Sequence, residues 1–245
     1  MTKDNLAPEK LYLLQLAAKS IPSADGPAME MVLGCYLIVT GKGRRVLVDT
    51  GMSPDARPPE APPPTQEKTV LELLADLGVK PEDIDTVVCS HFDVDHAGFH
   101  DAFPHAEFVV QREHYELALG GHPRLAKARI HWDHPGLRYR LLDGDTELLP
   151  GLTLLETSGH VAGHQSVLVR LPKAGSVLLA IDAVMMSRLF TPDRPAWPHD
   201  ENLDQLRAST VKLLDTAERS KASLVVFGHD GRQWQTLRKA PDYYD

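Results

Sequence analysis

The stretch SHFDVDHAG, residues 90–98, decides the fold of this 245-residue chain because it gathers metal-binding side chains in one place. It follows the apolar run TVVC at residues 86–89, which predicts a buried strand that ends in a loop, with a short helix from Ala97. A loop frees its two imidazoles and two carboxylates from the alternation of a strand, so they can converge on one point. Imidazole nitrogen and carboxylate oxygen both bind zinc and similar divalent ions. We therefore predict a metal site here.

Three further polar residues stand at the ends of apolar runs. They are His160, Asp182 and His229, which close the runs LLETSGH, VLLAID and LVVFGH. A charged group at the inner end of an apolar strand is costly unless it is paired or coordinated. Taken singly, each is better explained by a cap or a hydrogen bond, but with the first motif they give four histidines and three aspartates. That set suits two metal ions that share a bridging carboxylate, as in dinuclear hydrolytic sites.

The composition excludes some classes of function. Twenty-six basic against 34 acidic residues give a net charge of −8, which argues against a nucleic-acid partner held through phosphates. Cys35 and Cys89 both lie in apolar runs and are expected to be buried free thiols. The chain has no signal-type segment and no run of the roughly 20 apolar residues that a membrane span needs. We expect a cytoplasmic protein without a membrane partner.

The order of apolar runs predicts one α/β domain over residues 1–245. Runs at 10–18, 31–40 and 45–49 predict strands, the last two joined as a hairpin by the turn residues at 41–43. The proline-rich stretch at 54–64 is expected to be an exposed loop, either a lid or a connector. Helices are predicted over 65–77 and from Asp200, as N-cap, to about Arg219. Further strands are predicted at residues 108–111, 139–142, 152–157, 166–171, 177–182 and 224–227. Two sheets packed face to face with helices outside would bury all of these.

The combined motifs resemble a known family. His-x-Asp-x-Asp-His-Ala-Gly, then His160, Asp182 and Gly-His229-Asp, are similar to the metallo-β-lactamase superfamily, whose fold is an αββα sandwich of two mixed sheets flanked by helices. Within it the sequence most resembles the N-acyl homoserine lactonases, which open the lactone of bacterial quorum signals. The resemblance extends over nearly the whole chain, through residues 10–12, 35–37, 47–52, 110–112, 159–166, 175–179 and 227–230.

The resemblance implies which residues act at the centre. One divalent ion would be held by His91, Asp93 and His160, and a second by Asp95, His96 and His229, with Asp182 as the bridge. Zinc is the expected metal. His164 and Asp49 would orient the ligands, a role for which ordinary buried hydrogen bonding competes equally.

Two departures from the family pattern affect this assignment. Asp93 stands where the family usually has a third histidine; it would weaken Lewis acidity, favour harder ions such as manganese or iron(II), or leave one site weak. Met185 stands where these lactonases often carry a tyrosine that donates to the substrate carbonyl. Another donor would then have to serve, and Met185 and Met186 would line an apolar pocket or pack in the core.

The expected reaction is the opening of an N-acyl homoserine lactone ring by a metal-bound hydroxide, with Asp95 as the acid that passes a proton to the leaving oxygen. Residues 115–132 and 190–197 could form a groove for the acyl chain or simply cover the sandwich edge. The alternatives are a hydrolase of another lactone, ester, thioester or phosphotriester, a diiron oxidoreductase, or a non-catalytic metal-binding paralogue. The sequence leaves open whether the chain forms a homodimer. The remaining histidines are interpreted as solvated or structural: 100, 105, 114, 122, 131, 134 and 199.

Overall fold

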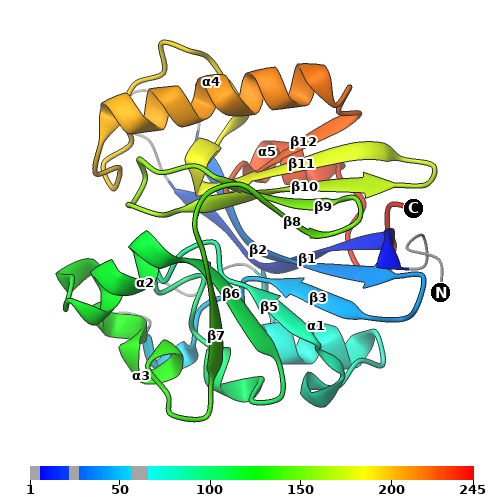
Figure 1. Ribbon diagram of the computed structural model, residues 1–245. Helices are drawn as coiled ribbons and strands as arrows, with labels where there is room; N and C mark the ends of the chain where they lie inside the picture. The colour runs from blue at the N-terminus through cyan, green and yellow to red at the C-terminus, as the bar shows by residue number, and fades with distance from the viewer. Residues whose placement is uncertain (1–5, 22–27, 57–65) are drawn as a thin grey trace.

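Two mixed β-sheets lie face to face in this computed structural model, which describes residues 6–21, 28–56 and 66–245 (Figure 1). The larger sheet has the strand order β4-β1-β2-β3-β5-β6-β7, and the smaller has β12-β11-β10-β9-β8. The strands of the larger sheet are β1 (Pro8–Ile21), β2 (Met29–Thr40), β3 (Arg45–Val48), β4 (Gln66–Glu67), β5 (Thr86–Val88), β6 (Glu107–Gln111) and β7 (Arg138–Leu142). Those of the smaller are β8 (Thr146–Leu149), β9 (Leu152–Glu156), β10 (Gln165–Leu171), β11 (Gly175–Ile181) and β12 (Leu224–Phe227).

Helices cover the outer face of each sheet. Helix α4 packs outside the smaller sheet, and α1, α2 and α3 lie outside the larger one (Figure 1). The α-helices are α1 (Val70–Asp76), α2 (Arg112–Leu119), α3 (Arg129–Trp132), α4 (Leu203–Arg219) and α5 (Gly231–Thr236). Short 3-10 helices are η2 (Pro54–Ala56), η3 (Pro81–Asp83), η4 (His100–Ala102), η5 (Pro123–Ala128), η6 (Asp182–Val184) and η7 (Ser187–Leu189).

The alternation of side chains along the strands produces three apolar layers. In β2, Cys35 and Leu37 point to the layer beneath the helices of the larger sheet. Tyr36 and Ile38 point the other way, into the layer between the two sheets. A third layer joins the smaller sheet to α4 through residues such as Leu213. The expected α/β fold, an αββα sandwich, is therefore confirmed.

Two local predictions, a hairpin and two buried thiols, are also confirmed. β2 and β3 pair as an antiparallel hairpin, with Tyr36 opposite Val48. Cys35 and Cys89 are buried free thiols. In the part of the chain that the structure describes, no helix combines the length and apolar character that crossing a membrane requires.

Three predicted helix boundaries are wrong. The first helix begins at Val70, five residues later than expected, because Thr69 caps it in a reciprocal capping box with Glu72. The last long helix is capped by Asn202, whose side chain accepts from the Gln205 amide at 3.1 Å, and Asp200 is not the cap.

No helix starts at Ala97 either. The next helical residues are those of η4. Gly98 instead donates its amide to the Gly51 carbonyl at 2.7 Å. A Cβ at this position would lie 2.2 Å from the Ser53 amide nitrogen, so the close contact requires glycine. Of the predicted proline-rich loop, residues 57–64 fall outside the described residues.

Strand directions bring the ends of several strands together. β9 and β11 both run antiparallel to β10, and β12 is parallel to β11, so all three end at the same edge of their sheet. In the larger sheet β3 and β5 are parallel. The polar residues that follow these strands form the candidate site described below.

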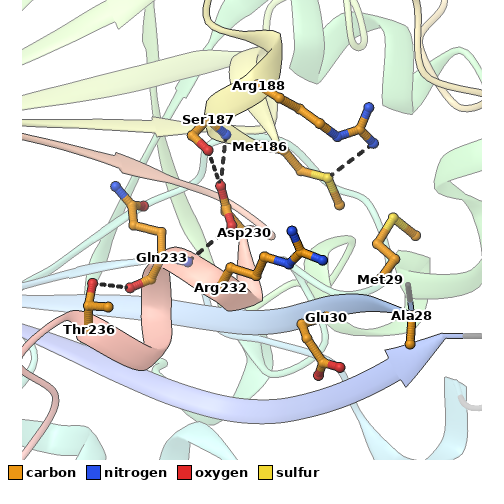
Figure 2. A pocket seen from close by; sticks show the side chains of 10 residues that line it. All are labelled: Ala28, Met29, Glu30, Met186, Ser187, Arg188, Asp230, Arg232, Gln233 and Thr236. Carbon is orange, nitrogen blue, oxygen red and sulfur yellow. Dashed lines mark hydrogen bonds between the residues drawn. The ribbon is translucent and has the colours of Figure 1, made fainter. Parts of the chain in front are cut away.

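A cavity of about 600 Å³ opens beside that edge (Figure 2). Met29 and Met186 form apolar parts of its wall, and Arg188, Asp230 and Arg232 form charged parts. The segments 115–132 and 190–197, for which the sequence left open a groove or a cover for the sandwich edge, contribute large side chains to the core. Trp132 is buried and stacks on Phe92, and Phe190 and Trp197 pack against the layer beneath α4.

Candidate metal centre

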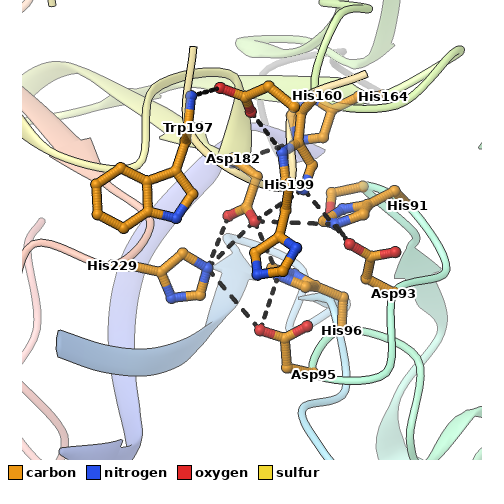
Figure 3. Close-up of polar contacts among 12 residues, drawn as sticks. His91, Asp93, Asp95, His96, His160, His164, Asp182, Trp197, His199 and His229 are labelled. Atoms are coloured by element: carbon orange, nitrogen blue, oxygen red, sulfur yellow. Dashed lines mark hydrogen bonds and ion pairs between the residues drawn. The ribbon is translucent and has the colours of Figure 1, made fainter. Parts of the chain in front are cut away.

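The seven residues predicted as ligands converge at the edge where the strands end (Figure 3). The structure places His91, Asp93 and His160 close enough to hold one ion, and we call them subsite A. It places Asp95, His96 and His229 together in the same way, and we call them subsite B. Asp182 groups with His91 and His96, one residue from each subsite, and therefore lies between the two.

The spacing around Asp182 matches the spacing of ligands about a shared ion. Its Oδ1 lies 3.1 Å from His229 Nε2, and its Oδ2 lies 3.3 Å from His160 Nε2 and 3.6 Å from His96 Nε2. Two ligand atoms each about 2.1 Å from a tetrahedral zinc ion are about 3.4 Å apart. The carboxylate thus reaches imidazoles of both subsites, as a bridging ligand must.

Buried atoms without partners point into this space. Among the described residues, His91 Nε2, His96 Nε2 and Asp182 Oδ1 are buried and make no hydrogen bond. An unsatisfied buried polar atom costs free energy, so such atoms need an explanation. Two imidazole nitrogens and a carboxylate oxygen suit a divalent cation. The residues present therefore fit a metal ion at the centre.

The opposite ring nitrogen of each histidine is held by another group. His96 Nδ1 lies 2.9 Å from Asp49 Oδ2, and His160 Nδ1 lies 2.9 Å from Asp200 Oδ1. His91 Nδ1 contacts Ser90 Oγ at 2.9 Å, and His229 Nδ1 donates to the Val32 carbonyl at 2.8 Å. These contacts fix each ring and turn its Nε2 toward the centre.

Asp49, which the sequence suggested as an orienting residue, organises one side of the centre. Besides His96 it accepts from the Ser90 amide at 2.8 Å and the Ser90 hydroxyl at 2.7 Å. Its φ of 62° is unusual for a residue other than glycine. Ile181, directly before Asp182, also has a positive φ of 51°. Local strain of this kind persists where surrounding contacts over-determine the backbone, often at functional sites.

We expect Asp49→Asn to lower metal affinity by about 10- to 100-fold, because the amide keeps the shape but cannot hold His96 with a carboxylate's charge. Equilibrium titration with zinc in a competing chelator measures this affinity. Asp85→Asn serves as the control. Asp85 lies outside the centre, and its carboxylate accepts a hydrogen bond of 2.8 Å from the Arg45 amide. Equal zinc affinity in the Asp49 variant and the wild type would contradict the assigned role.

His164 and His114 accept hydrogen bonds from backbone amides, and neither belongs to the groups of candidate ligands among the described residues. His164 Nε2 accepts from the Asp182 amide at 3.3 Å, and its Nδ1 contacts Thr157 Oγ1 at 2.9 Å. His114 Nε2 accepts from the Phe92 amide at 2.8 Å and so holds the first motif in place. The expectation that His114 is structural agrees with this geometry.

The electrostatics differ between the candidate ligands. Burial opposes protonation of His96, His160 and His229, but neighbouring carboxylates raise the pKa of all three rings, that of His160 to about 9, so these rings must lose a proton to bind a metal. Burial, helped by the neighbouring His96, lowers the pKa of His91 to about 3, so this ring is neutral at pH 7. Burial works against ionisation of Asp182, but His229 and His96 hold the pKa of its carboxyl well below its usual range. A neutral imidazole and an ionised carboxylate are the forms that bind a metal.

Met185 offers no donor to a substrate. Its side chain is buried in the layer beneath α4, and its backbone carbonyl accepts from the His229 amide at 2.9 Å. Met186 belongs to the same layer and also lines the cavity.

Sequence reasoning missed Arg124 and Asp200. Arg124, from η5, donates its Nε to Asp93 Oδ1 at 2.6 Å and Oδ2 at 2.9 Å, and its Nη2 contacts His160 Nε2 at 2.5 Å. Asp200, expected to cap a helix, instead binds His160 and pairs with the buried Arg194 at 3.2 Å. Neither residue has a motif around it, so the sequence carries no signal for these contacts.

Comparisons with known proteins agree with this geometry. Residues 35–229 match the family described as the metallo-beta-lactamase superfamily. The chain is 33% identical to an N-acyl homoserine lactonase of Bacillus thuringiensis, over 96% of this chain and 98% of that protein. It is similar to a quorum-quenching N-acyl homoserine lactone lactonase of known structure, with 32% identity and a TM-score of 0.84. The match covers 98% of this chain and 100% of that one.

A second solved structure is an N-acyl homoserine lactone hydrolase with the product N-hexanoyl-L-homoserine bound at its catalytic metal centre. It is 29% identical to this chain, with a TM-score of 0.83, and the match covers 98% of this chain and 100% of that one.

Proposed function

This chain belongs to the metallo-beta-lactamase superfamily, and to the N-acyl homoserine lactonases within it, and we propose that it hydrolyses the lactone ring of N-acyl homoserine lactones. The observation that carries the proposal is the convergence of four histidines and three aspartates in subsites A and B around Asp182. Imidazoles and carboxylates in two adjacent groups around a shared carboxylate support a hydrolytic metal centre. The similarity to the lactonases over 96% of the chain points to the lactone as its substrate.

The proposed ligands are the residues of subsites A and B, with Asp182 between them, and zinc is the proposed metal. When bound, a divalent ion would lower the pKa of a bound water toward about 7 and polarise the lactone carbonyl. Imidazole and carboxylate donors suit zinc, and the extra carboxylate of Asp93 extends the choice toward manganese or iron(II).

The residues of the chain supply positioning and a proton. Asp95 is the most exposed of the seven side chains, at 22%, and its Oδ2 lies within 3.8 Å of His96 Nε2. It therefore stands on the accessible side of the centre, where it can carry a proton to the ring oxygen as the C–O bond breaks. The cavity beside Asp230 has room for an acyl chain, with Met29 and Met186 as its apolar wall.

Proton release in weakly buffered solution tests the proposal. N-acyl homoserine lactones with short and long acyl chains are given to protein loaded with zinc, manganese or iron(II). Chelated protein is the control for metal dependence, and a thioester, an aryl ester and a phosphotriester are controls for substrate class. We expect metal-dependent opening of the lactones and slower reaction of the other esters. Protein that binds metal but turns over none of the lactones would overturn the proposal.

A further inference from the structure

Subsite A already contains a cation. The guanidinium of Arg124 faces Asp93, with Nε at 2.6 and 2.9 Å from its two carboxylate oxygens and Nη2 also in contact with Oδ2. The same Nη2 lies 2.5 Å from His160 Nε2. One side chain thus engages two of the three residues of subsite A.

These contacts occupy the lone pair of His160 Nε2 and some of those of the Asp93 carboxylate, which a metal ion in subsite A would need. A guanidinium has only N–H donors and no acceptor, so His160 Nε2 must accept from Arg124. A nitrogen lone pair that accepts a hydrogen bond cannot also coordinate an ion.

In subsite A only His91 Nε2 makes no hydrogen bond among the described residues. In subsite B, His96 Nε2 also makes none, and the printed contact of His229 Nε2 is to the neighbouring candidate ligand Asp182, at 3.2 Å from its Oδ2, not to a guanidinium. The two subsites are therefore unequally available.

Neighbouring backbone holds Arg124 in this position. Its Nη1 donates to the His160 carbonyl at 3.1 Å and also to the His199 carbonyl. Glu201 Oε1 lies 3.5 Å from the same nitrogen. The side chain is only 18% exposed. A guanidinium that is hydrogen-bonded on both of its edges gives up more charge-assisted hydrogen bonds when it moves away than a solvated guanidinium does.

The identity of residue 93 has a physical explanation in this contact. A carboxylate matches the fork of an arginine through two parallel hydrogen bonds, which a neutral imidazole cannot do. Arginine stays charged at all ordinary pH values. Asp93 and Arg124 thus form an ion pair. Its positive charge is permanent and comes from a side chain of the protein, not from a bound ion.

We propose that the guanidinium of Arg124 takes the place of one of the two metal ions, so that the chain binds a single divalent ion tightly, at subsite B with Asp182. The inference rests on the proposed function in requiring a metal centre, and it narrows the ligand set given there, because Asp93 and His160 would hold Arg124 in place of an ion. A second ion would enter subsite A by displacing Arg124, against the repulsion of a fixed positive charge at short range.

Metal stoichiometry tests the proposal without reference to activity. Protein stripped of metal is titrated with Zn²⁺ by calorimetry and with Co²⁺ by absorption and EPR spectroscopy, and bound metal is counted by elemental analysis after dialysis. We expect one tight ion per wild-type chain and an EPR signal of isolated Co²⁺. Arg124→Gln keeps an amide at the position but removes the charge, and it should bind two ions with a spin-coupled signal. Its second ion should bind about 100-fold or more tighter than in the wild type, because a nearby unit charge is gone from a partly buried site.

Two further variants keep the test decisive. Asp93→His removes the partner of Arg124 and adds an imidazole, so it should also bind two ions, even if Arg124→Gln fails to fold. Arg129→Gln is the matched control. Arg129 lies outside the centre and pairs with Asp133 at an N–O distance of 2.9 Å, so its loss should leave one tight ion.

Two equally tight ions in the wild type, or a single ion in folded Arg124→Gln and Asp93→His, would overturn the inference. A wild-type chain that binds one ion but opens no lactone would instead refute the proposed function alone.

Discussion

Asp182→Asn is expected to abolish lactone hydrolysis, with a loss of about 10³-fold or more, because several kcal/mol of metal-dependent transition-state stabilisation corresponds to about three factors of ten in rate. The Asp182 carboxylate lies within 3.3 Å of both His160 Nε2 and His229 Nε2, so its charge serves both subsites. An asparagine has the same shape but cannot bridge as an anion. The variant should also lose its tight metal ion, as counted by elemental analysis after dialysis.

The control for this substitution is Asp215→Asn on α4. Asp215 pairs with Arg219 at 2.7 Å on the exposed face of the helix, where one carboxylate contributes little. Its activity and metal content should equal those of the wild type. If Asp182→Asn retained activity within tenfold of the wild type at equal metal content, Asp182 would not be the bridging ligand.

The convergence of the candidate ligands was predictable because their positions follow from local sequence. Asp182 and His229 each close an apolar run, and a buried run of that length has few structures available other than a strand. When parallel strands end at one edge, the residues after them must meet there. The resemblance then assigned these residues to two groups, and the structure brings the same groups together. The chemical role of each ligand remains a proposal that the metal titrations test.

The contacts that tune the centre were not predictable in the same way. Arg124 lies 31 positions from Asp93, and Asp200 lies 40 positions from His160. Asp200 has the sequence context of a helix cap, and only the fold shows that Asn202 takes that role. Propensity describes a residue and its near neighbours, whereas these pairs depend on how distant loops pack. The sequence showed that Asp93 departs from the family pattern, and the structure supplies Arg124 as the reason.

A buried ion pair between two residues that are not proposed ligands also supports the centre. Arg194 and Asp200 both have fully buried side chains, with Arg194 Nη2 at 3.2 Å from Asp200 Oδ2. Arg194 Nη1 also donates to the Ala183 carbonyl, next to Asp182. The other oxygen of Asp200 holds His160 Nδ1 at 2.9 Å. The pair therefore links the loop before α4 to subsite A and to the backbone beside Asp182.

Arg194→Met is expected to destabilise the protein by about 3–5 kcal/mol, because it leaves the carboxylate of Asp200 buried without its partner. For a chain of this size that corresponds to a fall of about 6–20 °C in Tm. Thermal unfolding of the chelated protein measures it, so that loss of metal does not contribute. The control is Arg129→Met, whose exposed pair with Asp133 should be worth less than about 1 kcal/mol.

The double variant Arg194→Met with Asp200→Asn separates the ion pair from simple packing. Removing both charges leaves no uncompensated carboxylate, so the double variant should be more stable than Arg194→Met alone. An asparagine amide can still accept from His160 Nδ1, so the ring should keep its orientation while the charge behind it is lost. If the double variant were no more stable than Arg194→Met, packing of the arginine side chain, and not its charge, would hold this loop against the centre.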